Sequence, residues 1–499
     1  MPVRLGTPAQ FETVRRHLDE ARFNDETVCA ALKIGDMSGA GYATRGRIDA
    51  ASVSPALLAL IELFVLGAAV PADDFQQTCG AQAFAAFRAL DLIRPARHRT
   101  GAIVCPVWLY PLDGFVIASD RYNDADGGTW QPPPDAVFPA LDTGTLKLLR
   151  LLPAARGGDT LDLCGGCGIV ALHLSRTAKR AVSSDITVRS AYMAEFNGRL
   201  NGADITNVCG DLYAPVGGQR FDVISAHPPW VPSTGDAMVF RDGGDVGEAV
   251  IRRLIEGIAG HLGSAGTAVI VSLGRDTVET AYERRVRGWL GADGHDCDVI
   301  LGVEKVLTIE ELARSMRKLH FKDNAEEAER MAARMLELGT DKFIYGALFI
   351  RRTGQSVTEP PLRLRMSAHA AAADFERLFA WRSHRRSLGF HEWLNAAKPR
   401  LSPHLEVDVR QVVRENALVA GAVTLAAEAA FSTHLRTDAW TIPLISAFDG
   451  RQTVEQVFEE AQRSGQTPGD FPLAAFTNFV ALLIERGFLE VDLPARLQA

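Results

Sequence analysis

From residue 142 the sequence alternates short apolar segments with longer segments of helical periodicity, and this alternation limits the fold more than any other feature. The apolar segments are TLDLC, RAVSSD, ITNVC, FDVISA, AVIVSL, DVILGV and FIYGALFI, with helical patterns between the first five. Such alternation is typical of βαβ units, whose strands form a mostly parallel sheet with helices on both faces. We therefore expect an α/β fold with a Rossmann-like, seven-stranded core.

The regions on either side of this core have other patterns. In residues 1–125, three helical segments precede a hairpin signature around Pro111, Asp113 and Gly114, an arrangement typical of winged-helix-like domains. Residues 356–499 end in three helical segments and a short strand, which indicates a similar module. We expect mainly helical, winged-helix-like domains at 1–125 and 356–499, and a core domain at 126–355.

One helical stretch, residues 307–341, interrupts the last strands of the core. An insertion at this place would lie beside the carboxyl edge of the sheet, where open α/β sheets bind their ligands. Two interpretations are open: a cap over a substrate pocket, or a decoration of the surface.

Composition limits the partners and the compartment. The net charge of −8 argues against a broad basic surface for nucleic acid, and the short basic run from Arg382 to Arg386 favours a solvated helix face. Seven scattered cysteines, an odd number, make a disulfide framework improbable and favour a reducing compartment. We find no apolar run long enough to span a membrane and no signal core at the start, so we expect a cytoplasmic protein.

The most informative stretch is TLDLCGGCGIV, in which a strand ends at Asp162 and Leu163, a glycine-rich turn follows, and a helix begins at Ile169. The spacing lacks the third glycine of a dinucleotide fingerprint and the Gly-Lys-Ser/Thr of a phosphate loop. A redox or zinc role for Cys164 and Cys167 is disfavoured, because no second cysteine pair exists. The remaining interpretation is a turn that binds a nucleoside without a pyrophosphate, as S-adenosylmethionine requires.

Two acidic residues support a nucleoside site. Asp185 ends the next strand, where a carboxylate can accept hydrogen bonds from ribose hydroxyls. Asp211 and Leu212 follow the third strand, where the carboxylate would lie near an adenine amino group and the leucine against the ring. The fourth strand then runs into His227-Pro228-Pro229-Trp230, a loop that its prolines make rigid.

These motifs, with LDTGTL at 141–146 and FRDGGDVGEAVIRRLI at 240–255, resemble the class I S-adenosylmethionine-dependent methyltransferases with a small-methyltransferase domain. That group includes the enzymes that methylate the glutamine side-chain amide of release factors. The resemblance implies that S-adenosylmethionine is the cofactor, and we expect no metal site. It implies a cofactor site formed by Thr143, Asp162, Cys164, Gly166, Gly168, Asp185, Ile186, Asp211 and Leu212. It also implies a catalytic loop formed by His227, Pro228 and Trp230.

The loop departs from the family at one position. The family has Asn-Pro-Pro-Tyr or Asn-Pro-Pro-Phe, whereas this chain has His227 in place of the asparagine and Trp230 as the aromatic residue. An imidazole can take a proton near neutral pH, which an amide cannot. We therefore hypothesise that His227 serves as a general base and Trp230 as a stacking wall, with the alternatives of a tolerated amide replacement and of core packing.

Three functions follow from these residues. The first is methyl transfer to a nitrogen, or less readily an oxygen, of a small metabolite or peptide, with the terminal domains binding substrate, a carrier or partner protein, or a second copy. The second is N-methylation of a protein glutamine or a nucleic-acid adenine, of which the acidic composition disfavours nucleic acid. The third is a winged-helix regulator that senses S-adenosylmethionine without turnover.

Overall fold

The computed structural model describes residues 1–42, 45–129, 131–232, 238–319 and 325–494. The chain forms two compact units, one of Met1–Val299 with Val306–Pro360 and one of Ile300–Lys305 with Pro361–Ala499. The residues expected to form a separate N-terminal domain thus belong to the same unit as the core. No helix within the described ranges is long and apolar enough to cross a membrane.

The core of the first unit is a mixed sheet with the strand order β8-β7-β6-β9-β10-β12-β11. β6 to β9 and β10 pair in parallel, and β12 runs antiparallel to β10. The seven strands that the alternation predicted are present. Their bounds are Asp159–Leu163 (β6), Arg180–Asp185 (β7), Ile205–Cys209 (β8), Phe221–Ala226 (β9), Leu262–Thr277 (β10), Cys297–Leu307 (β11) and Thr340–Arg352 (β12).

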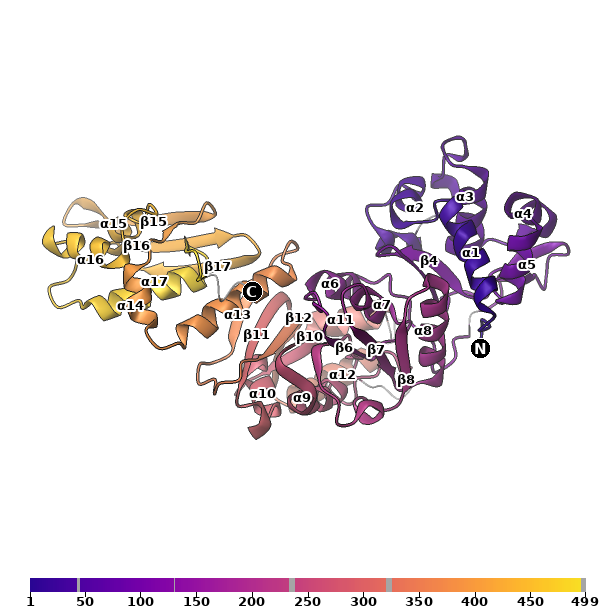
Figure 1. The fold of residues 1–499 in the computed structure, drawn as a ribbon. Coiled ribbons are helices and arrows are strands. Elements are labelled where there is room, and N and C mark those ends of the chain that lie inside the picture. The colour runs from indigo at the N-terminus through magenta and orange to yellow at the C-terminus, as the bar shows by residue number, and fades with distance from the viewer. Residues whose placement is uncertain (43–44, 130, 233–237, 320–324, 495–499) are drawn as a thin grey trace. The chain divides into compact units, whose positions relative to one another are not determined.

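Helices cover both faces of this sheet (Figure 1). They are α6 (Thr143–Leu151), α7 (Ile169–Ser175), α8 (Val188–Asn201), α9 (Ala249–His261) and α10 (Tyr282–Trp289). Leu161, Ile224 and Val269 of the central strands are fully buried, as expected for parallel strands that are covered on both sides. The expectation of a helix between β8 and β9 is wrong, because that short connection contains Pro215 and three glycines and forms only a 3₁₀ turn, Ala214–Val216.

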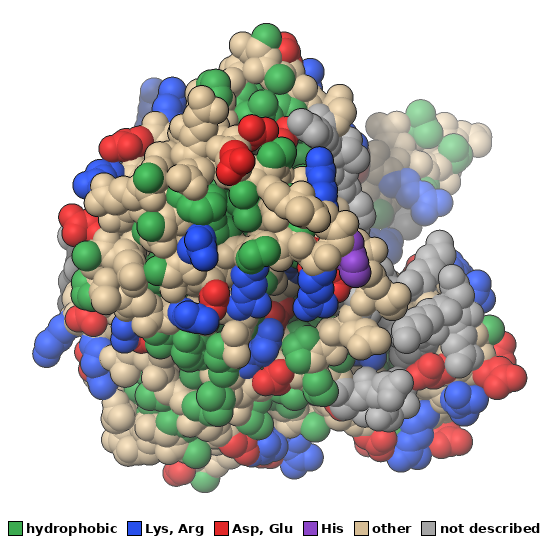
Figure 2. Space-filling model, turned by 90° about the vertical axis from the view of Figure 1, so that its right-hand side faces the viewer, with side chains coloured by type: hydrophobic (Ala, Val, Ile, Leu, Met, Phe, Trp, Pro, Cys, Tyr) green, Lys and Arg blue, Asp and Glu red, His purple; other side chains and the backbone are tan. Residues whose placement is uncertain are grey.

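The N-terminal part combines short helices with two small sheets. Its helices are α1 (Pro8–Glu20), α2 (Asp25–Leu32), α3 (Pro55–Leu60), α4 (Ala72–Cys79) and α5 (Ala81–Ala89). The strands β1 (Val70–Pro71), β2 (Arg94–Pro95) and β3 (Ala102–Val104) form a sheet in the order β1-β3-β2. Lys and Arg side chains are interspersed with Asp and Glu on the face drawn in Figure 2, so neither sign of charge covers it.

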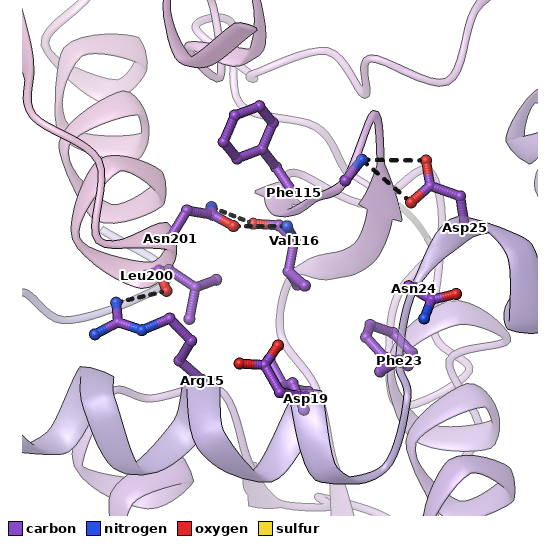
Figure 3. Close-up of a pocket in the computed structure, with 11 residues that line it drawn as sticks. Arg15, Asp19, Phe23, Asn24, Asp25, Phe115, Val116, Leu200 and Asn201 are labelled. Carbon is purple, nitrogen blue, oxygen red and sulfur yellow. Dashed lines mark hydrogen bonds between the residues drawn. The ribbon is translucent and has the colours of Figure 1, made fainter. Parts of the chain in front are cut away.

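The predicted hairpin is confirmed as β4 (Trp108–Leu112) and β5 (Phe115–Ser119), with Asp113 and Gly114 at positive φ in its turn. Side chains of α8 bind the backbone of this hairpin. Asn197 accepts a hydrogen bond of 2.8 Å from the amide of Ala118 and donates one of 2.9 Å to its carbonyl, and Asn201 makes two bonds of 2.8 Å with Val116 in the same way. Figure 3 shows the Asn201 contact at the rim of a pocket of about 220 Å³ between α1, the hairpin and α8.

The helical insertion consists of α11 (Ile309–Leu319) and α12 (Ala325–Glu337), and residues 320–324 between them lie outside the described residues. Its apolar residues, among them Leu312, Met316 and Met335, pack in one cluster with Val231 and Leu273, and Trp230 lies against this cluster. The insertion therefore covers the loop that follows β9.

The second unit is richer in strands than a mainly helical domain would be. Three antiparallel strands, β15 (Leu405–Arg414), β16 (Ala417–Glu428) and β17 (Phe431–Thr437), adjoin β13 (Leu362–Met366), which pairs with residues 300–303 of β11. The helices are α13 (Ala372–Arg385), α14 (Phe390–Ala396), α15 (Thr441–Ser446), α16 (Val454–Arg463) and α17 (Leu473–Glu485), and β14 (Arg400–Leu401) pairs with β18 (Leu489–Glu490). The mainly helical expectation for residues 356–499 did not include this antiparallel sheet, in which Glu415 and Asn416, both at positive φ, form the turn between β15 and β16.

The basic run on α13 is not the solvated face that its charge suggested. Arg382 is 5% exposed and His384 is 4% exposed. The carboxylate of Glu485 on α17 lies 3.5 Å from the guanidinium of Arg382 and 3.4 Å from that of Arg385. These arginines therefore neutralise a buried carboxylate between two helices, as buried charges require.

Candidate active site

The glycine-rich turn joins β6 to α7 through backbone conformations that most side chains avoid. Cys164, Gly166 and Gly168 all have positive φ. A Cβ atom on Gly165 would lie 2.2 Å from the hydroxyl of Ser183, and one on Gly168 would lie 2.8 Å from the Cβ of Ala194. A Cβ on Gly166 would meet nothing within 4 Å. Two of the glycines thus allow close packing of the turn, and Gly166 presents open backbone to a ligand.

Two carboxylates lie at the carboxyl ends of β6 and β7. Asp162 is 2% exposed and accepts a hydrogen bond of 2.9 Å from the hydroxyl of Ser225 on β9. Burial, together with the negative charge of Asp185, raises the pKa of Asp162 to about 8. Asp185 accepts hydrogen bonds of 3.0 Å from the amides of Gly166 and Thr187. Both carboxylates are therefore held in place before any ligand binds.

The edge next to β8 is more open. Ile186 is 56% exposed, and its carbonyl lies 3.5 Å from the thiol of Cys209. Asp211 forms an ion pair of 2.5 Å with Arg253 on α9, and the carbonyl of Leu212, at positive φ, accepts a hydrogen bond from Ser184. These exposed apolar and acidic groups offer a surface for a flat, polar-edged ring.

Cys167 is buried and Cys164 is partly buried. Burial raises the pKa of Cys167 to about 12 and that of Cys164 further still, with nearby carboxylates adding to both effects. Thiols of this kind stay protonated at neutral pH, whereas metal binding and redox chemistry need the thiolate. Among the described residues no group of three His, Cys, Asp or Glu side chains could hold a metal ion.

His227 follows β9 and lies against the first turn of α6. The amides of Gly144 and Thr145 donate hydrogen bonds of 2.7 and 3.1 Å to the carboxylate of Asp142, which caps this helix. A Cβ on Gly144 would lie 2.6 Å from the imidazole, so a glycine is required for this approach. The hydroxyl of Thr145 donates to Asp142 at 2.8 Å and lies 3.5 Å from Nδ1 of His227.

The surroundings keep His227 neutral. Burial lowers its pKa below the ordinary value of 6.5, the negative charge of Asp142 opposes that shift, and the positive charge of Lys147 adds to it. Because the proton of the Thr145 hydroxyl is donated to Asp142, the lone pairs of that oxygen face Nδ1. This arrangement favours the tautomer with the hydrogen on Nδ1 and a lone pair on Nε2.

Aromatic and basic side chains surround the loop. The ring of Trp230 lies 6.3 Å from that of Tyr345 on β12, and Nζ of Lys147, a buried residue of α6, lies 4.3 Å from the centre of the Tyr345 ring. Two glycines pack directly against the backbone of Trp230. A Cβ on Gly247 would lie 2.3 Å from the carbonyl oxygen of Trp230, and one on Gly243 would lie 2.8 Å from its Cα. The glycines of FRDGGDVGE thus permit close packing behind the loop.

A buried ion-pair network continues from these glycines. The carboxylate of Glu248 lies 2.8 Å from the guanidinium of Arg275 on β10 and 2.7 Å from that of Arg285 on α10. Arg275 also donates to the carbonyl of Leu338, directly after the insertion. Charged hydrogen bonds therefore join the end of the glycine segment to the sheet, to α10 and to the residue that follows the insertion.

A protein-family model, the methyltransferase small domain, matches residues 135–288 and so includes the glycine turn, the carboxylates and His227. The chain contains a class I S-adenosylmethionine-dependent methyltransferase domain. The described residues fit this cofactor, because Gly166 leaves backbone open beside Asp162 and Asp185, at the edge where ligands of open α/β sheets bind.

Curated relatives of the methyltransferase are distant. It is 29% identical over 145 residues to a candidate protein N5-glutamine methyltransferase of Methanocaldococcus jannaschii, covering 28% of this chain and 72% of the relative. It is 31% identical over 157 residues to the ribosomal protein uL3 glutamine methyltransferase of Bradyrhizobium diazoefficiens, covering 28% and 48%. It is 28% identical over 161 residues to the release factor glutamine methyltransferase of Geobacter sulfurreducens, covering 30% and 56%. The chain thus spans about half the length of the last two.

The sequence-predicted residues take different places in the methyltransferase. Asp162, Gly166, Asp185 and His227 lie at the ends of adjacent parallel strands, whereas Thr143 is exposed at the start of α6. Four residues of this region were not predicted from the sequence: Asp142, Thr145 and Lys147, which act on His227, and Tyr345, which lies beside Lys147 and Trp230. The Asp-x-x-Thr spacing of a helix cap was a usable signal for Asp142 and Thr145, but no local pattern pointed to Lys147 or Tyr345.

Proposed function

We propose that this methyltransferase methylates the side-chain amide nitrogen of a glutamine in a protein. The observation that carries the proposal is the imidazole of His227, whose pKa is lowered by burial and whose Nδ1 lies 3.5 Å from the Thr145 hydroxyl, an arrangement that favours Nε2 as a hydrogen-bond acceptor. A hydrogen-bond acceptor at this position can orient the substrate amide, as the asparagine carbonyl does in the family that the chain resembles. The names of the relatives, which act on protein glutamines, favour this reading over the small metabolite or peptide expected first.

In the proposed reaction, S-adenosylmethionine supplies an electrophilic methyl group. Nε2 of His227 accepts a hydrogen bond from the amide NH₂ and so orients the nitrogen toward that group. The prolines limit motion of the loop, and most of the rate enhancement comes from holding nucleophile and methyl group in line. After transfer the nitrogen loses one proton, which neutral His227 can take and pass to solvent.

The walls of the acceptor site suit a flat amide. Trp230 and Tyr345 supply aromatic faces, and the insertion packs behind Trp230 through an apolar cluster. For the N-terminal part we propose a winged-helix-type module, because α4 and α5 lie between β1 and β2 in the chain and a third strand, β3, completes its sheet. Its proposed role is to bind the protein that carries the glutamine.

Methyl transfer from tritiated S-adenosylmethionine to fractionated cell extract tests the proposal. We expect label in the protein fraction, with N5-methylglutamine found by mass spectrometry of the labelled peptides, and an initial rate of labelling at least about 100-fold lower with an H227A variant. Label confined to small metabolites or to nucleic acid would overturn the glutamine assignment. Cofactor binding without label in any fraction would instead indicate a sensor of S-adenosylmethionine.

A Thr145→Val variant tests the orientation of His227. Valine keeps the shape but removes the oxygen that faces Nδ1, so the favoured tautomer is lost and kcat should fall about 3- to 10-fold, the worth of one hydrogen bond. The KM for S-adenosylmethionine should not change. A Thr145→Ser control should restore the rate, and a serine variant as slow as the valine variant would assign the effect to packing of the threonine methyl group.

A further inference from the structure

The hairpin of β15 and β16 in the second unit exposes an apolar edge strand. β15 ends the strand order of its sheet, with β16 as its one neighbour among the described strands (Figure 1). An edge strand presents unpaired backbone donors and acceptors, which natural proteins usually cover or interrupt. Here the strand is long, Leu405–Arg414, and the extra residue of the local bulge lies on β16 at Gly421, so β15 itself is regular.

The two faces of β15 differ. Val407 and Val409 stand opposite Leu425 and Val423 of β16, which are fully buried in the core of the unit. The two valines continue this apolar layer, yet they are 42% and 49% exposed. The apolar layer therefore extends onto the edge strand beyond the part that the helices of the unit cover.

The other face of β15 carries charges without charged residues opposite them. Asp408 stands opposite Thr424, and Arg410 stands opposite Ala422. Opposite charges that face each other across strands stabilise a sheet, and like charges weaken it. The edge of β15 thus offers two acidic side chains, Glu406 and Asp408, followed by the basic side chain of Arg410, all on the same face, to a further strand.

We propose that a second copy of this chain pairs with β15 by antiparallel edge-to-edge addition, with the two-fold axis at Val409. A two-fold axis perpendicular to the sheet leaves each face of the two strands on the same side. In such a pairing one residue stands directly opposite its own copy, and the axis passes between the two. At Val409, Asp408 of each copy faces Arg410 of the other, and on the opposite face Val409 stands against its own copy, with Val407 of each copy opposite Gln411 of the other. The charge pattern is therefore self-complementary.

The registers centred on Val407, Asp408 and Arg410 each set like charges opposite each other, whereas the register centred on Val409 sets none. An axis at Asp408 places two carboxylates opposite each other, and one at Arg410 does the same with two guanidinium groups. An axis at Val407 sets Glu406 against Asp408. Among the four centres from Val407 to Arg410, only Val409 pairs every facing charge of Asp408 and Arg410 with an opposite one, so this register carries the proposal.

Charge reversal at the two positions tests the dimer in the full-length chain. D408R and R410D each place like charges opposite one another, so each variant alone should raise the dimer Kd by at least about tenfold in sedimentation velocity. An equimolar mixture of the two variants restores both opposite-charge pairs and should form a heterodimer. The double variant D408R/R410D should dimerise like the wild type.

Matched measurements separate the interface from folding. R451D changes an exposed arginine of the same unit outside the hairpin and should leave the Kd unchanged. All variants should keep the S-adenosylmethionine affinity of the wild type. A monomeric wild type at every soluble concentration would overturn the proposal. So would single variants that dimerise like the wild type, or a mixture of single variants that stays monomeric.

Discussion

Replacement of His227 by alanine should lower kcat for methyl transfer by about 10²- to 10⁴-fold, the range for loss of a positioned proton acceptor. Among the side chains of the His-Pro-Pro-Trp loop, only the imidazole has a ring nitrogen that can accept a hydrogen bond. It lies beside Gly144 and Thr145. Alanine leaves nothing to orient the acceptor amide. Initial rates with S-adenosylmethionine and the labelled protein fraction measure the effect, and unchanged cofactor affinity controls for folding.

A His227→Asn variant decides what kind of acceptor the site serves. An asparagine carbonyl can orient an amide, so H227N should keep activity within about tenfold of the wild type if the acceptor is a glutamine. If the acceptor is a hydroxyl or an ammonium group that must lose its proton first, H227N should be as slow as H227A. The alanine-like outcome would contradict the proposed function.

The pH profile gives an independent check on His227. Its pKa is lowered below 6.5, so the neutral form predominates at and above neutral pH, and wild-type activity should fall only on the acidic side of 6.5. Asparagine does not titrate, and the acidic limb should therefore be absent in H227N. An identical acidic limb in both proteins would assign it to another group.

Replacement of Asp162 by asparagine should weaken S-adenosylmethionine binding by about 10- to 100-fold, the worth of a charge-assisted hydrogen bond. The carboxyl is buried at the end of β6, with a pKa of about 8, so it is largely protonated at pH 7 in the free protein. A cationic amino group from the methionine portion favours the carboxylate, so binding should release a proton. Wild-type affinity should therefore rise toward pH 8, and that of D162N should not.

The same variant should stabilise the free protein at alkaline pH. The folded-state pKa of Asp162 is raised from 3.8 to about 8, so its stabilising contribution is complete below pH 4 and is lost as the pH rises toward 8. Each pKa unit corresponds to about 1.4 kcal/mol, and D162N avoids this loss. Urea unfolding at pH 5 and pH 8 should show an advantage of D162N that grows by several kcal/mol.

Asp159→Asn is the matched control for Asp162. Asp159 lies at the opposite end of β6, where it forms an ion pair of 2.9 Å with Arg180. Its replacement should leave cofactor affinity and its pH dependence unchanged. A D162N protein that binds the cofactor as tightly as the D159N protein would remove Asp162 from the cofactor site.

Parts of the site that depend on local backbone rules were predictable. The turn from Cys164 to Gly168 needs positive φ and close packing, which restricts the residues that can occupy it and leaves a visible pattern. The hairpin at Asp113 and Gly114 was predictable for the same reason. By contrast, the pattern LDTGTL does not say which threonine faces the site, because that depends on where α6 begins. Capping by Asp142 turns Thr145 toward His227 and leaves Thr143 exposed.

The sequence by itself determined the α/β core, the nucleoside-binding turn and the rigid loop with His227 and Trp230, since periodicity, glycine and proline act over a few residues. Only the tertiary structure decided what surrounds His227. Tyr345 reaches the site because β12 pairs with β10 in a register that sets it opposite Leu273, and Lys147 reaches it from α6. The burial that keeps His227 neutral and Asp162 protonated likewise comes from contacts between segments far apart in the chain, which no local pattern records.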